Sequence, residues 1–162
     1  MAYGKSKIKI SKLDPNDKAS IDKIADWYFS EWNTPIKKTI ERLSNQPSYD
    51  TIFQAILTID GELVATGGLC NHVNIYNKLP ELKQFKPWIA LLYTQQEYRN
   101  KGLGRKLLEF IERNAKANKL NKIYLYTFTA EAFYKSNGWK EITKVDYKSH
   151  KTVVMEKSII EA

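Results

Sequence analysis

The sequence has little of what marks a secreted, metal-binding or membrane-spanning protein. Its one cysteine, Cys70, cannot form a disulfide within the chain and has no metal-ligand partner at a recognisable spacing. The longest uninterrupted apolar run, Trp88 to Tyr93, is far too short to cross a bilayer. The first residues alternate lysine with isoleucine, which is unlike the hydrophobic core of a secretory signal. We therefore expect a cytoplasmic protein with no bound metal and no membrane partner.

An excess of basic residues is the main compositional bias. The 162 residues, 43% hydrophobic and 27% charged, suffice for one globular domain over residues 1–162. Lysine and arginine number 26 against 18 aspartate and glutamate residues, which gives a net charge of +8. Such a charge favours a nucleotide, a nucleic acid or another polyanionic partner, but it also serves solubility alone. Charge by itself leaves both interpretations open.

The chain begins with signals for a strand and two helices. Alternating residues predict a first strand around residues 7–13. Asp14-Pro15 and Thr34-Pro35 each place a capping side chain before a helix-starting proline. Apolar residues at helical spacing follow both signals, so we expect two helices within residues 15–43.

A hairpin and a long polar segment come next. Asp60-Gly61 lies between two alternating apolar runs, which predicts a tight hairpin. Gly67-Gly68 in its second strand indicates a bulge or a close backbone approach. The segment 71–87 is polar and has no period, which is typical of a binding loop or a mobile lid.

The second half alternates strands and helices. Trp88 to Thr94 is apolar on both faces and predicts a buried central strand. Apolar residues at helical spacing run from Leu103 to Ala115, and a strand around 122–127, a short helix and a hairpin within 139–157 follow. This order predicts an α/β domain with a mixed sheet.

Glycines and cations crowd the junction between the central strand and its helix. The stretch Tyr98 to Phe110, YRNKGLGRKLLEF, holds two glycines and four cationic side chains. A strand that runs through Gly-x-Gly into a helix exposes unpaired N–H groups at the positive end of the helix dipole. Gly102 and Gly104 let phosphate oxygens approach those groups closely. The turn therefore predicts a phosphate-bearing ligand, and a plain glycine-capped helix is the alternative.

Two common phosphate-binding motifs do not fit this turn. The dinucleotide fingerprint needs a glycine where Leu107 stands, and the Gly-Lys-Ser/Thr of a P-loop is missing. Arg99-x-x-Gly-x-Gly104 resembles instead the coenzyme A pyrophosphate loop of the GNAT N-acetyltransferase superfamily. The resemblance extends from Trp88 to about Ile142, because an Ala-x-x-x-Tyr-x-x-x-Gly-aromatic motif from Ala130 to Trp139 follows in the family's order.

The resemblance implies the GNAT fold, with a mixed central β-sheet flanked by helices. It also implies transfer of an acetyl group from acetyl-CoA to a primary amine that attacks the thioester directly. Residues 88–142 would form the cofactor-binding core, with the acceptor on the side of residues 15–43 and 71–87. The parallel strands 88–94 and 122–127 would separate to admit the pantetheine arm. Tyr134 matches the family's proton donor to the departing sulfur. The implied cofactor-binding residues are Leu92, Thr94, Arg99, Asn100, Lys101, Gly102, Leu103, Gly104, Arg105 and Thr127.

This chain departs from the family's pattern at three positions. Thr94 and Gln96 stand where the family often has a valine and a proline, which leaves the backbone N–H groups of the turn unchanged. Thr127 stands where the family often has asparagine. A threonine keeps one hydrogen bond to the pantetheine arm but not the full set of an amide.

The acceptor side offers candidates of two kinds. Trp27 and Trp32 form an aromatic wall that would hold an amine cation, and a packed core is the alternative. Glu31, His72 and Glu81 are candidates for the general base, and a chain of water molecules is the alternative. We take Trp27, Glu31, Trp32 and His72 as the predicted substrate-binding residues.

Other functions remain compatible with these residues. A non-catalytic acyl-CoA-binding or sensor domain is the main alternative to the enzyme. A basic nucleic-acid-binding module is a weaker one, because no helix-turn-helix or stacking-aromatic pattern appears. For the enzyme we favour a small-molecule amine over a protein amine. The last hairpin, within residues 139–157, offers an edge for pairing two copies into a homodimer.

Overall fold

The structure is a computed structural model that describes residues 6–159. Its core is a seven-stranded mixed sheet with the order β1-β2-β3-β4-β5-β7-β6, in which β4 and β5 alone are parallel. The strands are β1 (Ile8–Lys12), β2 (Thr51–Ile59), β3 (Glu62–Cys70), β4 (Trp88–Thr94), β5 (Lys122–Thr127), β6 (Lys140–Tyr147) and β7 (His150–Ser158). The helices are α1 (Lys18–Trp32), α2 (Ile36–Ser44), α3 (Leu103–Ala117) and α4 (Glu131–Ser136), with short 3₁₀ helices η2 (Asn74–Asn77), η3 (Pro80–Gln84) and η4 (Gln96–Tyr98).

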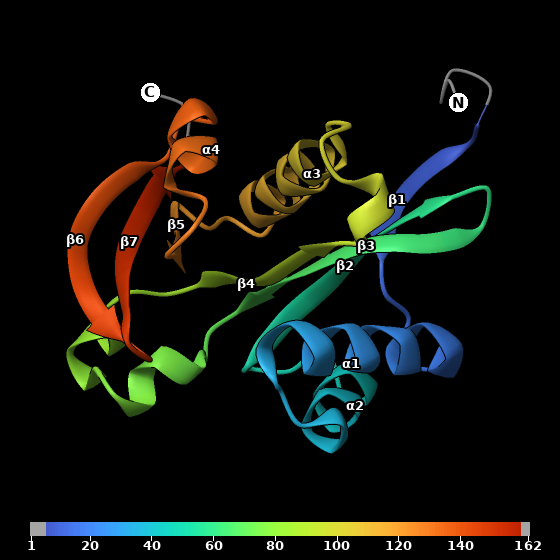
Figure 1. Cartoon of the computed structure of the whole chain (residues 1–162), viewed down its shortest axis with the longest axis horizontal. Coiled ribbons are helices and arrows are strands. Elements are labelled where there is room, and N and C mark those ends of the chain that lie inside the picture. Colours follow the sequence, from blue (N-terminus) through green and yellow to red (C-terminus); the bar gives the residue numbers. More distant parts are fainter. Residues whose placement is uncertain (1–5, 160–162) are drawn as a thin grey trace.

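Helices cover both faces of the sheet (Figure 1). The helix α3 lies over β2, β3 and β4 on one face, and α1 and α2 lie on the opposite face. The C-terminal strands β5, β7 and β6 carry α4 on the same side as α3. The predicted α/β fold with a mixed, helix-flanked sheet is confirmed.

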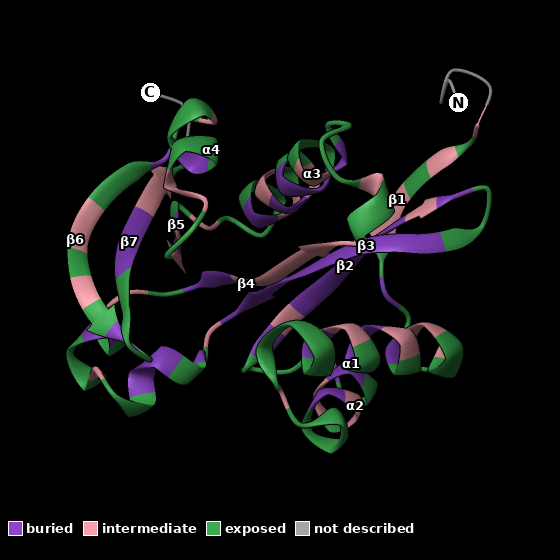
Figure 2. Ribbon diagram, in the orientation of Figure 1, coloured by how far each residue is buried: buried purple, intermediate pink, exposed green. Residues whose placement is uncertain are grey.

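Buried residues gather on the central strands and on the inner faces of the long helices (Figure 2). The apolar positions that the sequence places at helical spacing on α1 and α3 are those that are buried. These residues are Ile21, Ile24, Ala25 and Tyr28 on α1, and Leu103, Leu107, Leu108, Ile111 and Ala115 on α3.

The first helix begins later than the sequence indicated. The Asp14 carboxylate accepts the N–H of Asn16 at 2.8 Å, which closes a turn before the helix starts. Asp17 is the actual cap, because its carboxylate accepts the N–H of Ser20 at 3.2 Å and the Ser20 hydroxyl at 2.7 Å. The second helix begins after Pro35 without a side-chain cap from Thr34.

Segment 71–87 is not the irregular connection that its polar sequence suggested. It contains η2 and η3, which bury Ile75, Tyr76 and Leu82 against Trp88 and the C-terminal hairpin. The Trp88 indole donates its N–H to the Phe85 carbonyl at 2.6 Å, and this contact fixes the end of the segment. No helix within residues 6–159 is long and apolar enough to cross a membrane.

Candidate active site

Strand β4 lies at the centre of the candidate site, and one of its edges is paired from end to end except at one bulge. It pairs with β3 from Trp88 to Thr94, but Leu91 and Leu92 together lie opposite Gly67, which makes a β-bulge. A Cβ on Gly67 would lie 2.7 Å from Leu92 Cδ1, so glycine is needed for this close approach. The bulge or close approach predicted at Gly67-Gly68 is therefore confirmed, with the extra residue on the partner strand.

Buried hydrogen bonds hold the bulge in place. Leu91 has a positive φ of 55°, a backbone conformation that costs a residue with a side chain about 1–3 kcal/mol. The Tyr28 hydroxyl donates to the Leu91 carbonyl at 2.7 Å and accepts from Gln54 Nε2 at 3.0 Å. Burial raises the pKa of Tyr28 to about 12, so its hydroxyl stays protonated and able to donate. Tyr28 is thus a core residue.

The other edge of β4 is almost unpaired. The strands β4 and β5 share one paired position, Trp88 with Tyr124, and then separate. Trp88 and Ile89 are buried, but residues 90–94 are all half-buried. The prediction of a buried strand is therefore right only for Trp88 and Ile89, because β5 does not pair with β4 beyond Trp88.

Backbone N–H groups face the gap left by β5. Gln95 donates its N–H to the Val64 carbonyl of β3 at 2.9 Å. Successive N–H groups alternate along a strand, so those of Leu92 and Thr94 point away from β3, toward the open edge. Both residues are among those that the sequence assigned to cofactor binding.

The open edge of β4 leads through η4 to the glycine turn at the start of α3. Asn100 and Gly102 both have positive φ values, 63° and 80°. Gly102 is the N-cap residue of α3, and no side chain of residues 6–159 caps its first-turn N–H groups. A Cβ on Gly102 would meet nothing within 4 Å, and one on Gly104 would lie no closer than 3.8 Å to Thr94 Oγ1. The space over this uncapped helix end fits an anionic phosphate.

Two of the cations near the turn are engaged by other residues. Arg99 Nε donates to the Thr94 carbonyl at 2.7 Å, and its guanidinium lies 5.3 Å from the centre of the Tyr93 ring. Arg105 Nε lies 3.7 Å from the Glu109 carboxylate on the exposed face of α3. Arg99 therefore lies back along β4, whereas Arg105 lies on the first turn of α3.

Tyr134 lies in α4 with only 9% of its surface exposed. Its ring packs against Phe133 and Trp139, with centroids 5.1 and 6.1 Å apart. Burial raises the pKa of Tyr134 to about 12. Within the described part of the chain its hydroxyl makes no hydrogen bond. A hydroxyl that is protonated and without an internal acceptor is suited to donate to a ligand.

Thr127, at the end of β5, uses its side chain within the chain. Its Oγ1 accepts the N–H of Ala130 at 3.1 Å and that of Thr129 at 3.3 Å, which closes the loop before α4. The hydroxyl proton is what remains for a ligand, so Thr127 offers one hydrogen bond, as its residue type indicated.

The aromatic residues of α1 gather around Tyr93 of β4. Ring centroids lie 5.0 Å apart for Trp27 and Tyr93, and 6.0 Å apart for Trp32 and Tyr93. The chain's own cations already lie over two of these rings, Lys23 over Trp27 at 5.4 Å and Arg99 over Tyr93. The expected aromatic wall forms, but Trp32, 36% exposed, is its solvent-facing member. Sequence reasoning missed Tyr93, because it ends an apolar run that reads as core.

The candidate bases lie on different elements. Glu31 Oε1 lies 3.6 Å from Arg99 Nη2, so the end of α1 is linked to the residue that opens the glycine turn. His72 and Glu81 are exposed on segment 71–87, where the His72 ring lies edge-on to Tyr76 at 5.7 Å. Figure 1 places that segment beside the β6–β7 turn, apart from α1. The structure thus groups Trp27, Glu31 and Trp32 and leaves His72 on a separate element. No cluster of His, Cys, Asp and Glu that would hold a metal ion occurs among residues 6–159.

Comparisons with known proteins agree with this architecture. Residues 50–141 match the family model described as the acetyltransferase (GNAT) domain. A search of curated proteins found no match.

Similar solved structures include three acetyltransferases. An aminoglycoside 6'-N-acetyltransferase complexed with coenzyme A has a TM-score of 0.76 and 16% identity, over 95% of this chain and 98% of that one. The ribosomal-protein-S18-alanine N-acetyltransferase from Escherichia coli has a TM-score of 0.69 and 20% identity, over 96% of both chains. The PaiA N-acetyltransferase from Thermoplasma acidophilum, in complex with coenzyme A, has a TM-score of 0.64 and 23% identity, over 94% and 99%.

Proposed function

The chain belongs to the GNAT acetyltransferase family, and from that premise we propose that it transfers an acetyl group from acetyl-CoA to a small primary amine. The amine attacks the thioester directly while both substrates are bound. Bound acetyl-CoA supplies an activated acyl carbon and a thiolate leaving group.

The observation that carries the proposal is a pair of backbone donor sets, one on the open edge of β4 and one at the start of α3. Leu92 and Thr94 turn their N–H groups to the open edge, and the first turn of α3 adds uncapped N–H groups beyond Gly102. Donors on the strand suit the amide groups and carbonyl of an acyl-pantetheine arm. Donors at the helix end suit its pyrophosphate. Thr127, on β5, adds one side-chain donor across the gap.

Tyr134 is the proposed proton donor to the departing sulfur. Its pKa of about 12 keeps the hydroxyl protonated at neutral pH, which excludes it as a base and suits it as an acid. The Tyr134 hydroxyl has no hydrogen-bond acceptor among the described residues, and the sulfur of the bound cofactor would supply one.

The amine must lose a proton before or during its attack, because an unperturbed amine has a pKa near 10. We propose Glu31 as the residue that takes this proton, directly or through water. It is the candidate base on an element that packs against β4, and its carboxylate lies 3.6 Å from Arg99 Nη2, beside the start of the glycine turn.

For the acceptor we propose a small-molecule amine, with a protein N-terminus as second choice. The aminoglycoside and ribosomal-protein acetyltransferases among the similar structures represent these two classes. A screen of both classes with detection of released free thiol distinguishes them. Release that depends on a small amine supports the first choice.

Calorimetric titration with acetyl-CoA tests the cofactor site. Gly104→Glu puts a carboxylate where the phosphate is proposed, and a negative charge at a helix N-terminus does not disfavour the helix. We expect its Kd for acetyl-CoA to rise about 100-fold through charge repulsion. The matched control, Gly104→Gln, has the size of glutamate without its charge and only ordinary contacts for its Cβ, so it should bind more tightly than Gly104→Glu. Equal binding by both variants would contradict the site, and binding without thiol release would favour a sensor domain.

A further inference from the structure

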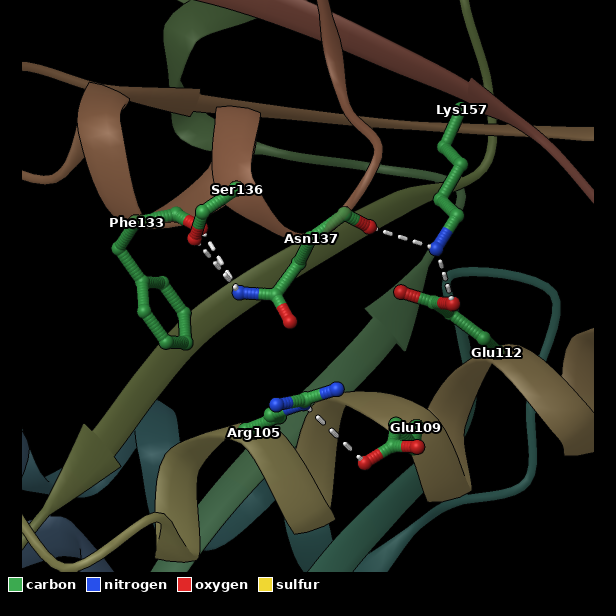
Figure 3. Close-up of polar contacts among 7 residues, drawn as sticks. All are labelled: Arg105, Glu109, Glu112, Phe133, Ser136, Asn137 and Lys157. Carbon is green, nitrogen blue, oxygen red and sulfur yellow. Dashed lines mark hydrogen bonds and ion pairs between the residues drawn. The ribbon is translucent and has the colours of Figure 1, made fainter.

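Lys157 of β7 joins three elements around the end of α4 (Figure 3). Its Nζ donates to Glu112 Oε1 of α3 at 2.7 Å and to the carbonyl of Asn137 at 2.8 Å. The contact lies beside a groove of about 260 Å³ between α3 and α4, which Arg105 and Ser136 also line.

The Lys157 contact is more protected than a comparable ion pair on the same strand. The side chains of Lys157 and Glu112 are 25% and 15% exposed. Those of Lys122 on β5 and Glu156 on β7 are 44% and 30% exposed, and the charged groups lie 3.4 Å apart. An exposed pair contributes little to stability, whereas a shielded lysine with two acceptors fixes its partners in space.

The local sequence makes room for the lysine. Gly138 has a φ of 91°, and a Cβ there would lie 3.3 Å from Lys157 Cε and 3.4 Å from its Nζ. A side chain at this position would therefore press on the ammonium group. Gly138, the glycine of the Gly-aromatic pair, therefore leaves space for the Lys157 side chain.

Hydrogen bonds connect the Lys157 contact to Tyr134. The N–H groups of Asn137 and Trp139 both donate to the Tyr134 carbonyl, at 3.0 and 3.1 Å. The helix α4 has only six residues, and Ala130 gives it no side-chain cap. So short a helix is not stable alone and takes its position from tertiary contacts.

We propose that Lys157 is a positioning residue for Tyr134. By holding the Asn137 carbonyl it fixes the C-terminal end of α4, and thereby the place of the Tyr134 hydroxyl. The inference rests on the proposed function, in which Tyr134 donates a proton. Glu112 orients the ammonium group of Lys157, whereas the hydrogen bond from Lys157 to the Asn137 carbonyl fixes the position of α4.

The test uses Lys157→Met in a Glu112→Gln background, so that no carboxylate is left without its partner. The controls are Glu112→Gln alone and Lys122→Met, which removes the exposed pair next to it. We expect kcat of the double variant to fall about tenfold to 100-fold, as small displacements of a catalytic group do. KM for acetyl-CoA should stay within about twofold, because the donors on β4 and α3 are untouched. Both controls should keep the wild-type kcat.

A second background separates positioning from general weakening of the fold. In Tyr134→Phe there is no hydroxyl to position, so the added Lys157 and Glu112 changes should cause no further loss of kcat. In the protein without ligand, the amides of Asn137 and Trp139 should exchange about tenfold faster with Lys157 replaced, but not in the Lys122→Met control.

The outcomes distinguish the two proposals. A wild type that releases no thiol, or a Tyr134→Phe variant as active as the wild type, overturns the proton-donor role and the inference with it. An active wild type in which the Lys157 loss is equal in both backgrounds overturns the inference alone. Unchanged exchange at Asn137 and Trp139 also overturns it, independently of any activity.

Discussion

The two edges of β4 show how one strand can serve both stability and binding. Toward β3 the strand is paired along its length, and its bulge is held by Tyr28 and Gln54. Toward β5 it is paired at Trp88 and Tyr124 alone, and its later N–H groups have no strand to bind. The hydrogen bonds to β3 hold the backbone of β4 in place. The N–H groups on its other edge therefore keep their positions and stay available to a ligand.

Crowding the paired edge should have the largest effect. In Gly67→Val, the Cβ alone would lie 2.7 Å from Leu92 Cδ1 and 3.3 Å from Ile111 Cδ1. We expect the free energy of unfolding to fall by about 3 kcal/mol through overpacking, and acetyl-CoA binding to weaken as Leu92 moves. Urea unfolding followed by circular dichroism, together with calorimetry, measures both. Weakened stability with intact binding would mean that the two edges are independent.

Removing the hydroxyl that holds the bulge should have a moderate effect. Tyr28→Phe leaves the half-buried Leu91 carbonyl without its donor, so we expect a loss of about 2 kcal/mol in urea unfolding. Tyr126→Phe is the matched control, since the Tyr126 hydroxyl makes no hydrogen bond within residues 6–159, and it should cost less than about 0.5 kcal/mol. Equal losses of unfolding free energy in the two variants would show that the hydrogen bond from Tyr28 to Leu91 does not stabilise the bulge.

Alkaline pH should weaken the paired edge by a smaller amount. The pKa of Tyr28 rises from 10.0 to about 12 on folding, so the unfolded chain releases this proton first. The stabilisation is fully present below pH 10 and is lost as the pH rises toward 12. Between pH 9 and 11 the wild type should lose about 1 kcal/mol more than Tyr28→Phe, measured by urea unfolding at each pH. Parallel profiles would contradict the raised pKa.

Local chemistry made much of the fold readable. Asp60-Gly61 predicted the hairpin, since both residues have positive φ, and period-three-to-four apolar spacing predicted the buried faces of α1 and α3. Asp17 was overlooked in favour of Asp14, because a carboxylate two residues before a backbone N–H closes a turn as readily as it caps a helix.

The parts of the candidate site that backbone groups form could be predicted from the sequence. The parts that long side chains form could be predicted less well. The glycine turn could be recognised in the sequence because Gly102 and Gly104 lack side chains. The separation of β4 from β5 depends on pairing between distant segments, which no local pattern encodes, so only the family resemblance implied it. The placements of Arg99 and Lys157 depend on which acceptors the fold brings within reach, so their roles could not be read from charge alone.

Segment 71–87 has a hydrophobic cluster of its own. Val73, Ile75, Tyr76 and Leu82 pack with Trp88 and the C-terminal hairpin, whereas Leu107 and Ile111 beneath the glycine turn belong to a different cluster. Exposed positions such as His72 and Glu81 can therefore be exchanged without disturbing the packing that supports the turn. Substitutions on the surface of segment 71–87 and substitutions under the glycine turn should therefore act on stability independently of each other.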